Sequence, residues 1–511
     1  MKAKNSILLR ALIVVSLVTA NIAHADNTAN STLSGKPYTK PTDLDISLPS
    51  DVTSNLPELG DASQTVLTPQ EEQRIGNEIL REVAVSDDVV QDVEIIDYLQ
   101  ALGNRLAAAS DDRHQAFNFF VVQDNTINAF AMPGGVIGVH TGLFLAVNSE
   151  SELASVLGHE IGHVTQHHLA RMLAKQKTDT FKNIAGIAFA LLVARANPEL
   201  ANGALTASSA AGIQRQLDYT REHEREADRV GLTIMENAGF DPRAMPAFFN
   251  TLQRGTRFSE GGAPSFLRTH PLTAERISDV ANRVETLPYK QVTDSLDFQM
   301  VRAKLRASQG LAQTAIDQFQ DNIKEGRFAN ETAEHYGLGV AMLRKNDIAG
   351  AAAQVKWLKA NGTKSAFIEN LSARVEMARN SPQTAASQYA SALKLFPNNR
   401  ALVYGDAELF LMTNQLDKAI QLVQSKQALF PNDAYFYELL AKAYTAKGKD
   451  LLRYQAQSEA YYRKYNLQKA VEQMDFAAKA KDGTFYEKSI VEARLKELQR
   501  LQAIEKAASS S

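Results

Sequence analysis

The most informative absence is cysteine, which does not occur anywhere in the 511-residue chain. Without thiols there can be no disulfide, no cysteine nucleophile, no thiolate zinc site and no lipid anchor attached through cysteine. Any metal would therefore have to be held by His, Asp and Glu side chains. A cysteine-free exported protein also suits the oxidising bacterial envelope, where stray thiols would be oxidised.

A marked excess of charge is also missing. The chain carries 55 basic and 58 acidic residues, for a net charge of −3, which gives no reason to expect a nucleic-acid partner. Hydrophobic residues make up 44% and charged residues 22%, which is the balance of a soluble globular protein. The length exceeds that of one ordinary domain and favours two or three.

The N-terminus has the pattern of a processing signal. Basic residues precede an apolar run over 11–20, and Ala23-His24-Ala25 has the form of a signal-peptidase site. We predict a signal peptide over residues 1–25, cleaved after Ala25, and no transmembrane span after its removal. An uncleaved anchor is the alternative, although the apolar run is short for a bilayer span.

The next segments change in character along the chain. Residues 26–65 are rich in Ser, Thr, Asn, Asp and Pro and predict a linker or a strap on the surface. Helical periodicity begins at Thr68-Pro69, and residues 117–122 and 129–142 predict strands. The segment 128–136 contains a Pro-Gly-Gly turn and predicts a hairpin or an interrupted edge strand.

Two strong helices follow, separated by an apolar segment. Ser149 and Glu152 form a capping-box pattern at the start of the first helix. The second is expected over about 214–238 and ends at Gly239. The eleven apolar residues 184–194 are too few to span a bilayer. They predict either a buried helix or a mobile or membrane-touching element near the active site.

From about Asp297 the chain has a purely helical pattern that repeats every 34 residues, the tetratricopeptide period. The recurring positions are Asn346, Asn380 and Asn414; Ala351, Ala385 and Ala419; and the Phe-Pro-Asn runs at 396–398 and 430–432. We expect the small residue of each unit to lie where two helices cross closely. Such arrays form curved surfaces that bind other proteins, so we predict a protein partner for this region.

The chemistry is concentrated in His159-Glu160-Ile161-Gly162-His163, an H-E-x-x-H motif. Residues four apart on a helix share a face, so both imidazoles can bind one Zn²⁺ per chain. Glu160 would act as the catalytic base that takes a proton from the attacking water. Chance would give only roughly 0.02 copies of such a pattern in a chain of this composition.

A zinc site of this kind needs a third protein ligand, and a Glu on a second helix is the thermolysin-like solution. Glu224 fits that position, although by spacing alone Glu222 and Glu226 compete with it. Asp228 lies four residues after Glu224 and shares its face. It would either orient a ligand histidine or donate a proton to the leaving amine.

Three further histidines need an interpretation. His167 and His168 follow the motif on the same helix and are interpreted as helix-surface residues or as residues that support the ligands. His270 precedes Pro271 in a predicted loop. It could donate a hydrogen bond to the developing oxyanion, occupy the fourth zinc position in a resting enzyme, or simply pack the loop.

The combined pattern resembles the zinc peptidase family that contains the CAAX prenyl endopeptidases and the bacterial heat-shock membrane proteases. The residues that carry the resemblance are the His159–His163 motif, Arg221-x-x-Glu224-x-x-x-Asp228 and Asn128-Ala129-Phe130. The resemblance implies that His159, His163 and Glu224 bind zinc, that Glu160 is catalytic and that Asp228 is a proton donor. The family also has a His-Pro at the position of His270. Unlike the membrane-embedded relatives, this chain has no predicted spans after its signal, and it has Thr220 where the family often has Ser.

The predicted fold is an α+β zincin-like metalloprotease domain over 66–290, followed by an all-α tetratricopeptide solenoid over 297–505. This order is similar to that of periplasmic family members of Gram-negative bacteria. The similarity implies a zinc endopeptidase that degrades misassembled outer-membrane proteins and assists their assembly, with the barrel assembly machinery as partner of the repeats. An extended polypeptide substrate would pair with the 128–136 strand. A chaperone or adaptor that acts mainly through its repeats is the alternative.

Overall fold

The computed structural model describes residues 67–112, 115–175, 210–258, 265–361 and 364–510. The predicted signal peptide 1–25, the linker 26–65 and the apolar segment 184–194 lie outside these residues. The chain divides into two compact units, residues 1–68 with 170–218 and residues 69–169 with 219–511. The described part of the first unit consists of residues 67–68, 170–175 and 210–218, and the second unit contains all the other described residues.

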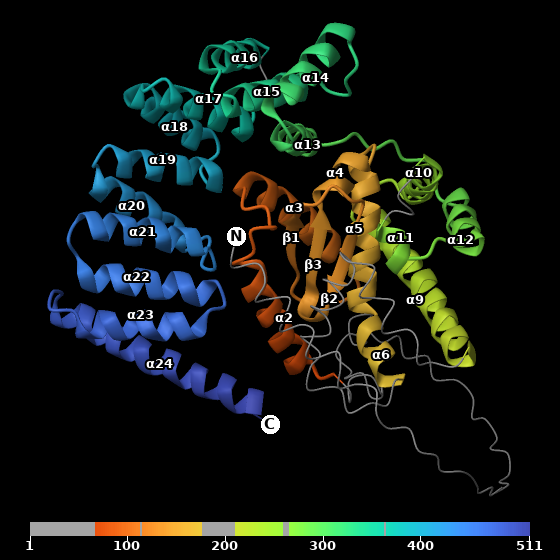
Figure 1. Cartoon of the computed structure of the whole chain (residues 1–511), viewed down its shortest axis with the longest axis horizontal. Coiled ribbons are helices and arrows are strands. Elements are labelled where there is room, and N and C mark those ends of the chain that lie inside the picture. The colour runs from red at the N-terminus through yellow and green to blue at the C-terminus, as the bar shows by residue number, and fades with distance from the viewer. Residues whose placement is uncertain (1–66, 113–114, 176–209, 259–264, 362–363, 511) are drawn as a thin grey trace, which may run out of the picture. The chain divides into compact units, whose positions relative to one another are not determined.

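A three-stranded sheet lies at the centre of the N-terminal half of the second unit (Figure 1). Its strands are β1 (Asn118–Val122), β2 (Ala129–Met132) and β3 (Val136–His140), in the order β1-β3-β2. β3 pairs in parallel with β1 and antiparallel with β2, with Val139 opposite Val121 and Ala129. Of the two alternatives predicted for residues 128–136, the hairpin is the one observed, and the strand expected to reach Gly142 ends at His140.

The turn between β2 and β3 depends on glycine. It is a short 3₁₀ segment, η2 (Pro133–Gly135), in which Gly134 and Gly135 have φ values of 75° and 71°. A Cβ atom on Gly135 would lie 2.1 Å from the backbone oxygen of Ala116. Only glycine can combine this backbone conformation with such a close approach.

Helices surround the sheet. α3 packs against β1 and against α5, and α5 packs against β2. The helices of this half are α2 (Pro69–Val83), α3 (Val93–Ala107), α4 (Thr141–Ala146), α5 (Glu150–Thr165), α6 (His168–Lys175), α9 (Ala210–Asn237), α10 (Ala244–Phe258), α11 (Ser265–Thr269) and α12 (Ala274–Glu285). The predicted capping of α5 is confirmed, since the Ser149 hydroxyl accepts a hydrogen bond from the Glu152 N–H at 3.2 Å.

α5 and α9 cross at a distance that only small residues allow. A Cβ on Gly158 would lie 3.2 Å from the backbone oxygen of Gly231, and one on Gly162 would lie 3.1 Å from that of Ala227. Both α5 glycines flank the motif histidines in sequence. The close crossing therefore brings the histidines of α5 within reach of the acidic side chains of α9.

The C-terminal half is built from consecutive antiparallel helices, each beside the next (Figure 1). They are α13 (Leu296–Ser308), α14 (Ala312–Glu325), α15 (Glu331–Arg344), α16 (Ile348–Ala360), α17 (Ala366–Ala378), α18 (Pro382–Leu395), α19 (Arg400–Met412), α20 (Leu416–Gln427), α21 (Ala434–Ala446), α22 (Asp450–Arg463), α23 (Leu467–Lys479) and α24 (Phe485–Ser510).

The 34-residue period has a backbone cause. Asn346, Asn380 and Asn414 have φ values of 67°, 57° and 56° and end the first helix of each pair in the left-handed conformation, which Asn and Gly adopt most easily. Gly448 follows 34 residues after Asn414 with φ of 65° and extends the series. The alanines of the period, Ala351, Ala385 and Ala419, are all buried, as expected for close helix crossings.

The hydrophobic core is continuous from the sheet into the first repeats. One buried cluster runs from Ile95 to Val375 and so crosses the predicted boundary between residues 290 and 297. Polar contacts cross the boundary as well, because Glu150 at the start of α5 accepts hydrogen bonds from the N–H and hydroxyl of Ser295 at 2.8 and 2.7 Å. The predicted domain ranges stay a prediction.

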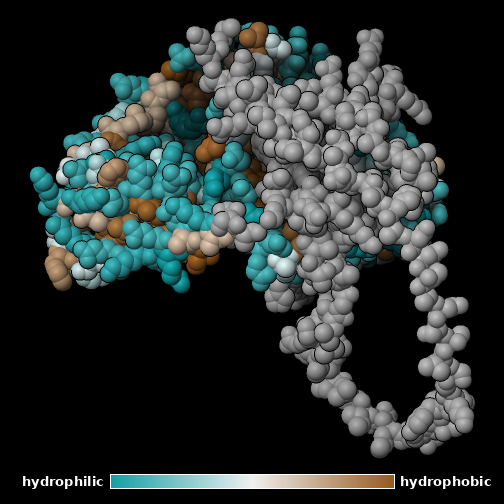
Figure 2. Space-filling view, turned by 60° about the horizontal axis from the view of Figure 1, so that its bottom comes forward, coloured by the Kyte–Doolittle hydropathy of each residue, from teal (hydrophilic) through white to brown (hydrophobic). Residues whose placement is uncertain are grey.

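The surface agrees with the balanced composition. The part of Figure 2 drawn in colour is mostly hydrophilic, with separate hydrophobic patches. Among the residues described, no helix combines the length and the apolar content that crossing a bilayer requires.

Candidate metal centre

Four side chains from three segments converge on one point. His159 and His163 come from α5, Glu224 from α9, and His270 from the turn between α11 and α12. One ligand-type atom of each lies within 4.8 Å of the others. The Nε2 atoms of His159 and His163 are 3.0 Å apart. The two Glu224 oxygens each lie 3.4 Å from one of these nitrogens, so the donors surround a common centre.

Helix phase places the three acidic residues of α9 in different surroundings. Glu224 is 2% exposed and faces the histidines, whereas Glu222 is exposed and Glu226 is turned toward His168. The structure therefore brings together all three residues predicted as ligands, His159, His163 and Glu224.

Glu160 lies beside this group in a position that suits a base. It is 1% exposed, and neither carboxylate oxygen accepts a hydrogen bond from the described residues. The Nε2 atom of His270 lies 3.4 Å from Glu160 Oε1, longer than a well-formed hydrogen bond. A buried carboxylate without hydrogen bonds is costly, so this one fits a partner that binds at the centre.

His159 is held from behind by a buried ion pair. Its Nδ1 lies 2.9 Å from Asp228 Oδ1. Arg276 of α12 donates from Nε and Nη2 to the two Asp228 oxygens, at 2.7 Å each. The Nη1 of the same guanidinium lies 2.8 Å from Glu224 Oε2, so one arginine braces both carboxylates.

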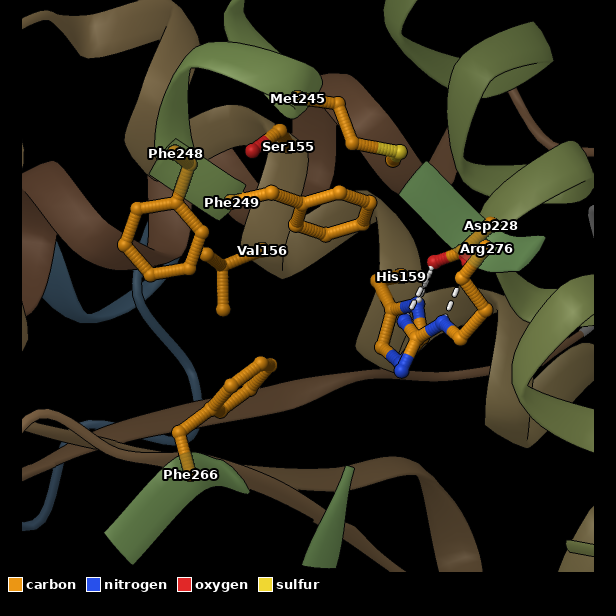
Figure 3. A pocket seen from close by; sticks show the side chains of 9 residues that line it. All are labelled: Ser155, Val156, His159, Asp228, Met245, Phe248, Phe249, Phe266 and Arg276. Atoms are coloured by element: carbon orange, nitrogen blue, oxygen red, sulfur yellow. Dashed lines mark hydrogen bonds and ion pairs between the residues drawn. The ribbon is translucent and has the colours of Figure 1, made fainter. Parts of the chain in front are cut away.

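An apolar wall shields this ion pair. Figure 3 shows His159, Asp228 and Arg276 joined by dashed lines on one side of a small cavity. The rings of Phe248, Phe249 and Phe266 line the remainder, with Met245. Such a low-dielectric wall strengthens the charge interactions behind the histidine.

The carboxylates are ionised and set the charge of the site. Burial acts to raise the pKa of Glu224, but the charge of His270 and hydrogen bonds from the histidines hold it well below the usual range. Burial likewise opposes ionisation of Asp228, whose pKa is lowered by Arg276 and His159. Burial lowers the pKa of His159, but hydrogen bonds to Asp228 and Glu224 outweigh it and raise the value to about 10. A site that stabilises a proton this strongly also suits a divalent cation.

His163 is supported differently. Burial lowers its pKa and favours the neutral ring, which is the form that binds metals. Its Nδ1 lies 2.8 Å from Nδ1 of His168, and His168 Nε2 lies 3.0 Å from Glu226 Oε2. His168 is thus a neighbour of a predicted ligand, one of the two interpretations open to it from sequence.

His270 reaches the centre as well. Its Nδ1 is 3.0 Å from Glu224 Oε1 and 3.3 Å from His159 Nε2. The ring also stacks on Phe266, with centroids 4.5 Å apart. His270 therefore both packs against Phe266 and contacts the candidate ligands.

Sequence reasoning missed Arg276 entirely. It is 2% exposed, and its contact with Asp228 spans 48 positions. No local pattern marks it, apart from its place six residues after His270 in the helix that follows the His-Pro turn.

Comparison with known proteins agrees with this geometry. The model of peptidase family M48 matches residues 96–284, and that of the tetratricopeptide repeat matches residues 376–443. The chain contains a peptidase family M48 domain followed by tetratricopeptide repeats. This arrangement confirms the predicted fold class, and the M48 domain implies a metal cofactor.

Several known proteins are similar to this chain over much of its length. It is 29% identical over 454 residues to the beta-barrel assembly-enhancing protease of Escherichia coli K12, covering 88% of this chain and 93% of that one. It is 29% identical over 448 residues to the protein of the same name from Yersinia pestis, covering 87% and 92%. A Vibrio cholerae protein that bears the name provisionally is 39% identical over 290 residues, or 56% of this chain and 60% of that one.

Proposed function

We propose that this M48 protein is a zinc-dependent endopeptidase of the bacterial periplasm that degrades misassembled outer-membrane proteins and assists their assembly. The observation that carries the proposal is the buried group of His159, His163 and Glu224 beside the Glu160 carboxylate, which accepts no hydrogen bond from the described residues. The names of the relatives support the connection with barrel assembly.

The donor set fits zinc. Two imidazoles and one carboxylate from two helices are a usual set for catalytic zinc, and no thiolate is needed. His159, His163 and Glu224 would hold the ion. When bound, zinc would supply a Lewis acid that acidifies water and polarises the scissile carbonyl.

The protein's own residues would carry the proton. Glu160 would accept it from the water that attacks the carbonyl. Asp228 was assigned either an orienting role or proton donation to the leaving amine. Its oxygens are engaged by Arg276 and His159, and its side chain is 1% exposed, which favours the orienting role.

His270 would restrain the resting enzyme. Its Nδ1 lies among the ligand atoms, so it is able to take a fourth position and close the site. On this account His270→Ala raises proteolysis, including self-cleavage, while the metal stays bound. An oxyanion role predicts the opposite, a rate lower by roughly 10²–10³-fold.

The substrate would be an extended polypeptide. β2 is at the edge of the three described strands and packs against α5, so it is the candidate strand for pairing with a substrate. The repeats would bind a protein partner, with the barrel assembly machinery as the candidate. A chaperone or adaptor role for the repeats remains the second hypothesis.

The test separates these two hypotheses. Purified protein without residues 1–25 is incubated with casein and with an unfolded outer-membrane protein, with and without chelator. We expect cleavage that the chelator abolishes and that Glu160→Gln eliminates without loss of metal. If Glu160→Gln restores barrel assembly as well as the wild type does in cells that lack the protein, the repeats rather than the peptidase carry the function.

A further inference from the structure

The ring of His163 makes a contact that the metal site itself does not require. Its Nε2 belongs to the ligand group, while its Nδ1 points away and meets Nδ1 of His168 at 2.8 Å. His168 is 4% exposed, and its other ring nitrogen, Nε2, lies 3.0 Å from Glu226 Oε2. A line of three side chains thus leads from the centre toward the surface.

A break in the backbone creates this contact. His168 follows His163 by five positions, and on a continuous helix this spacing turns the second side chain well away from the first. The chain instead ends α5 at Thr165 and begins α6 at His168, with His167 between them at φ of 50°. Few residues other than glycine adopt this conformation, although His is among those that tolerate it. The turn brings His168 back over His163.

The proton positions along this line are fixed by the metal end. If Nε2 of a neutral His163 binds a cation, its proton is on Nδ1, which must donate to His168. Nδ1 of His168 then accepts, so a neutral His168 carries its proton on Nε2 and donates it to Glu226. The carboxylate accepts at the outer end, and each group has the role that its neighbour needs.

The helix that supplies the acidic ligand also supplies the far end of this line. α9 presents Glu224 to the centre and Glu226 to His168. His223 of the same helix stacks on the His168 ring, with centroids 4.2 Å apart and an angle of 4° between the planes. The His168 ring is therefore held both in plane and face-on by α9.

We propose that His168 and Glu226 are positioning residues that orient His163 and strengthen its bond to the metal, an inference that rests on the proposed metal site. Partners of this kind fix the tautomer and raise the basicity of a ligand histidine, and their loss typically weakens metal binding by about 10- to 100-fold. Neither residue needs to touch substrate.

The test measures metal affinity rather than activity. The protein that lacks only residues 1–25 is freed of metal, and its zinc binding is measured by competition with a chromophoric chelator. His168→Phe keeps an aromatic ring that can stack on His223 but removes both ring nitrogens. We therefore expect zinc binding to be about 10- to 100-fold weaker. His168→Asn keeps an acceptor near His163 Nδ1 and should recover most of that loss.

Two further variants complete the design. His167→Asn removes the neighbouring imidazole, tolerates the positive φ, and should bind zinc as the wild type does. Glu226→Ala should weaken binding less than His168→Phe and add nothing in the double variant, because both act through one line. The unfolding midpoint of the metal-free protein should be unchanged in each.

Several results would overturn the inference: equal affinity for wild type and His168→Phe, no recovery with His168→Asn, or additive losses in the double variant. A fall in the metal-free unfolding midpoint that matches the loss of affinity would also overturn it, because His168 would then be structural. If the wild type itself binds no zinc, the proposed function fails instead, which distinguishes the two.

Discussion

The two motif histidines are supported from behind in opposite ways. His159 rests on Asp228 and Arg276, the inner support, whose side chains are 1% and 2% exposed. His163 rests on His168 and Glu226, the outer support, whose carboxylate side chain is 38% exposed. The inner support is an ion pair lined by aromatic rings, while the outer support runs through the His168 imidazole to a partly exposed carboxylate.

The difference indicates that the two supports affect the metal site in different ways. A buried ion pair leaves an uncompensated charge when one partner is removed, so the inner support should determine whether the site is formed at all. At the outer support, water can replace Glu226. It should therefore adjust how tightly the metal is held without deciding whether the protein folds.

The largest effect is expected at the inner support. Arg276→Met would strip Asp228 and Glu224 of their shared cation and should lower the free energy of unfolding by about 3–5 kcal/mol. Arg283→Met, an exposed arginine on the same helix, should change it by no more than about 0.5 kcal/mol. Urea unfolding of the metal-free protein makes the comparison. Equal shifts for the two variants would mean that the inner support contributes nothing special.

Next in size is Asp228→Asn. It keeps the shape of the side chain but removes the charge that faces His159 Nδ1, so zinc affinity should fall by about 10- to 100-fold. Chelator competition measures this, with Asp279→Asn on the surface of α12 as control. Unchanged affinity in Asp228→Asn would contradict an orienting role for Asp228.

A smaller change is expected for Glu226→Gln. The amide oxygen can still accept from His168 Nε2, and the site is half exposed, so zinc affinity should fall by less than about 10-fold. The same competition assay applies. A loss as large as that of Asp228→Asn would erase the distinction between inner and outer supports.

The smallest effect is expected for Glu222→Gln. Glu222 is exposed on α9, outside the ligand group and both supports. Its substitution should leave zinc binding unchanged, whereas Glu224→Gln should weaken binding strongly. If Glu222→Gln, Glu224→Gln and Glu226→Gln behave alike, the face of α9 that meets the metal has been misassigned.

The group of proposed ligands could be predicted because helices are periodic. His159 and His163 share a face at four-residue spacing, and the phase of α9 selects Glu224 once its orientation is known. The close crossing at Gly158 and Gly162 explains why those two faces meet. From sequence alone this crossing could not be foreseen, so Glu222 and Glu226 stayed open.

The supports were harder to predict because they depend on breaks in regular structure. Arg276 reaches Asp228 only through the turn after α11, and His168 reaches His163 only through the left-handed residue His167. A left-handed residue also explains the 34-residue period of the repeats. Asn346 and its equivalents recur because each ends a helix with positive φ, and Gly448 continues the series with a different residue type.

The central claim is that His159, His163 and Glu224 hold one catalytic zinc ion beside Glu160. The most direct measurement is the zinc content of purified wild-type, His159→Ala, His163→Ala and Glu160→Gln proteins, with casein cleavage measured on the same samples. The account predicts close to one zinc per chain in the wild type and in Glu160→Gln, none in the two histidine variants, and cleavage by the wild type alone. Full zinc content in both histidine variants, or cleavage by Glu160→Gln, would contradict it.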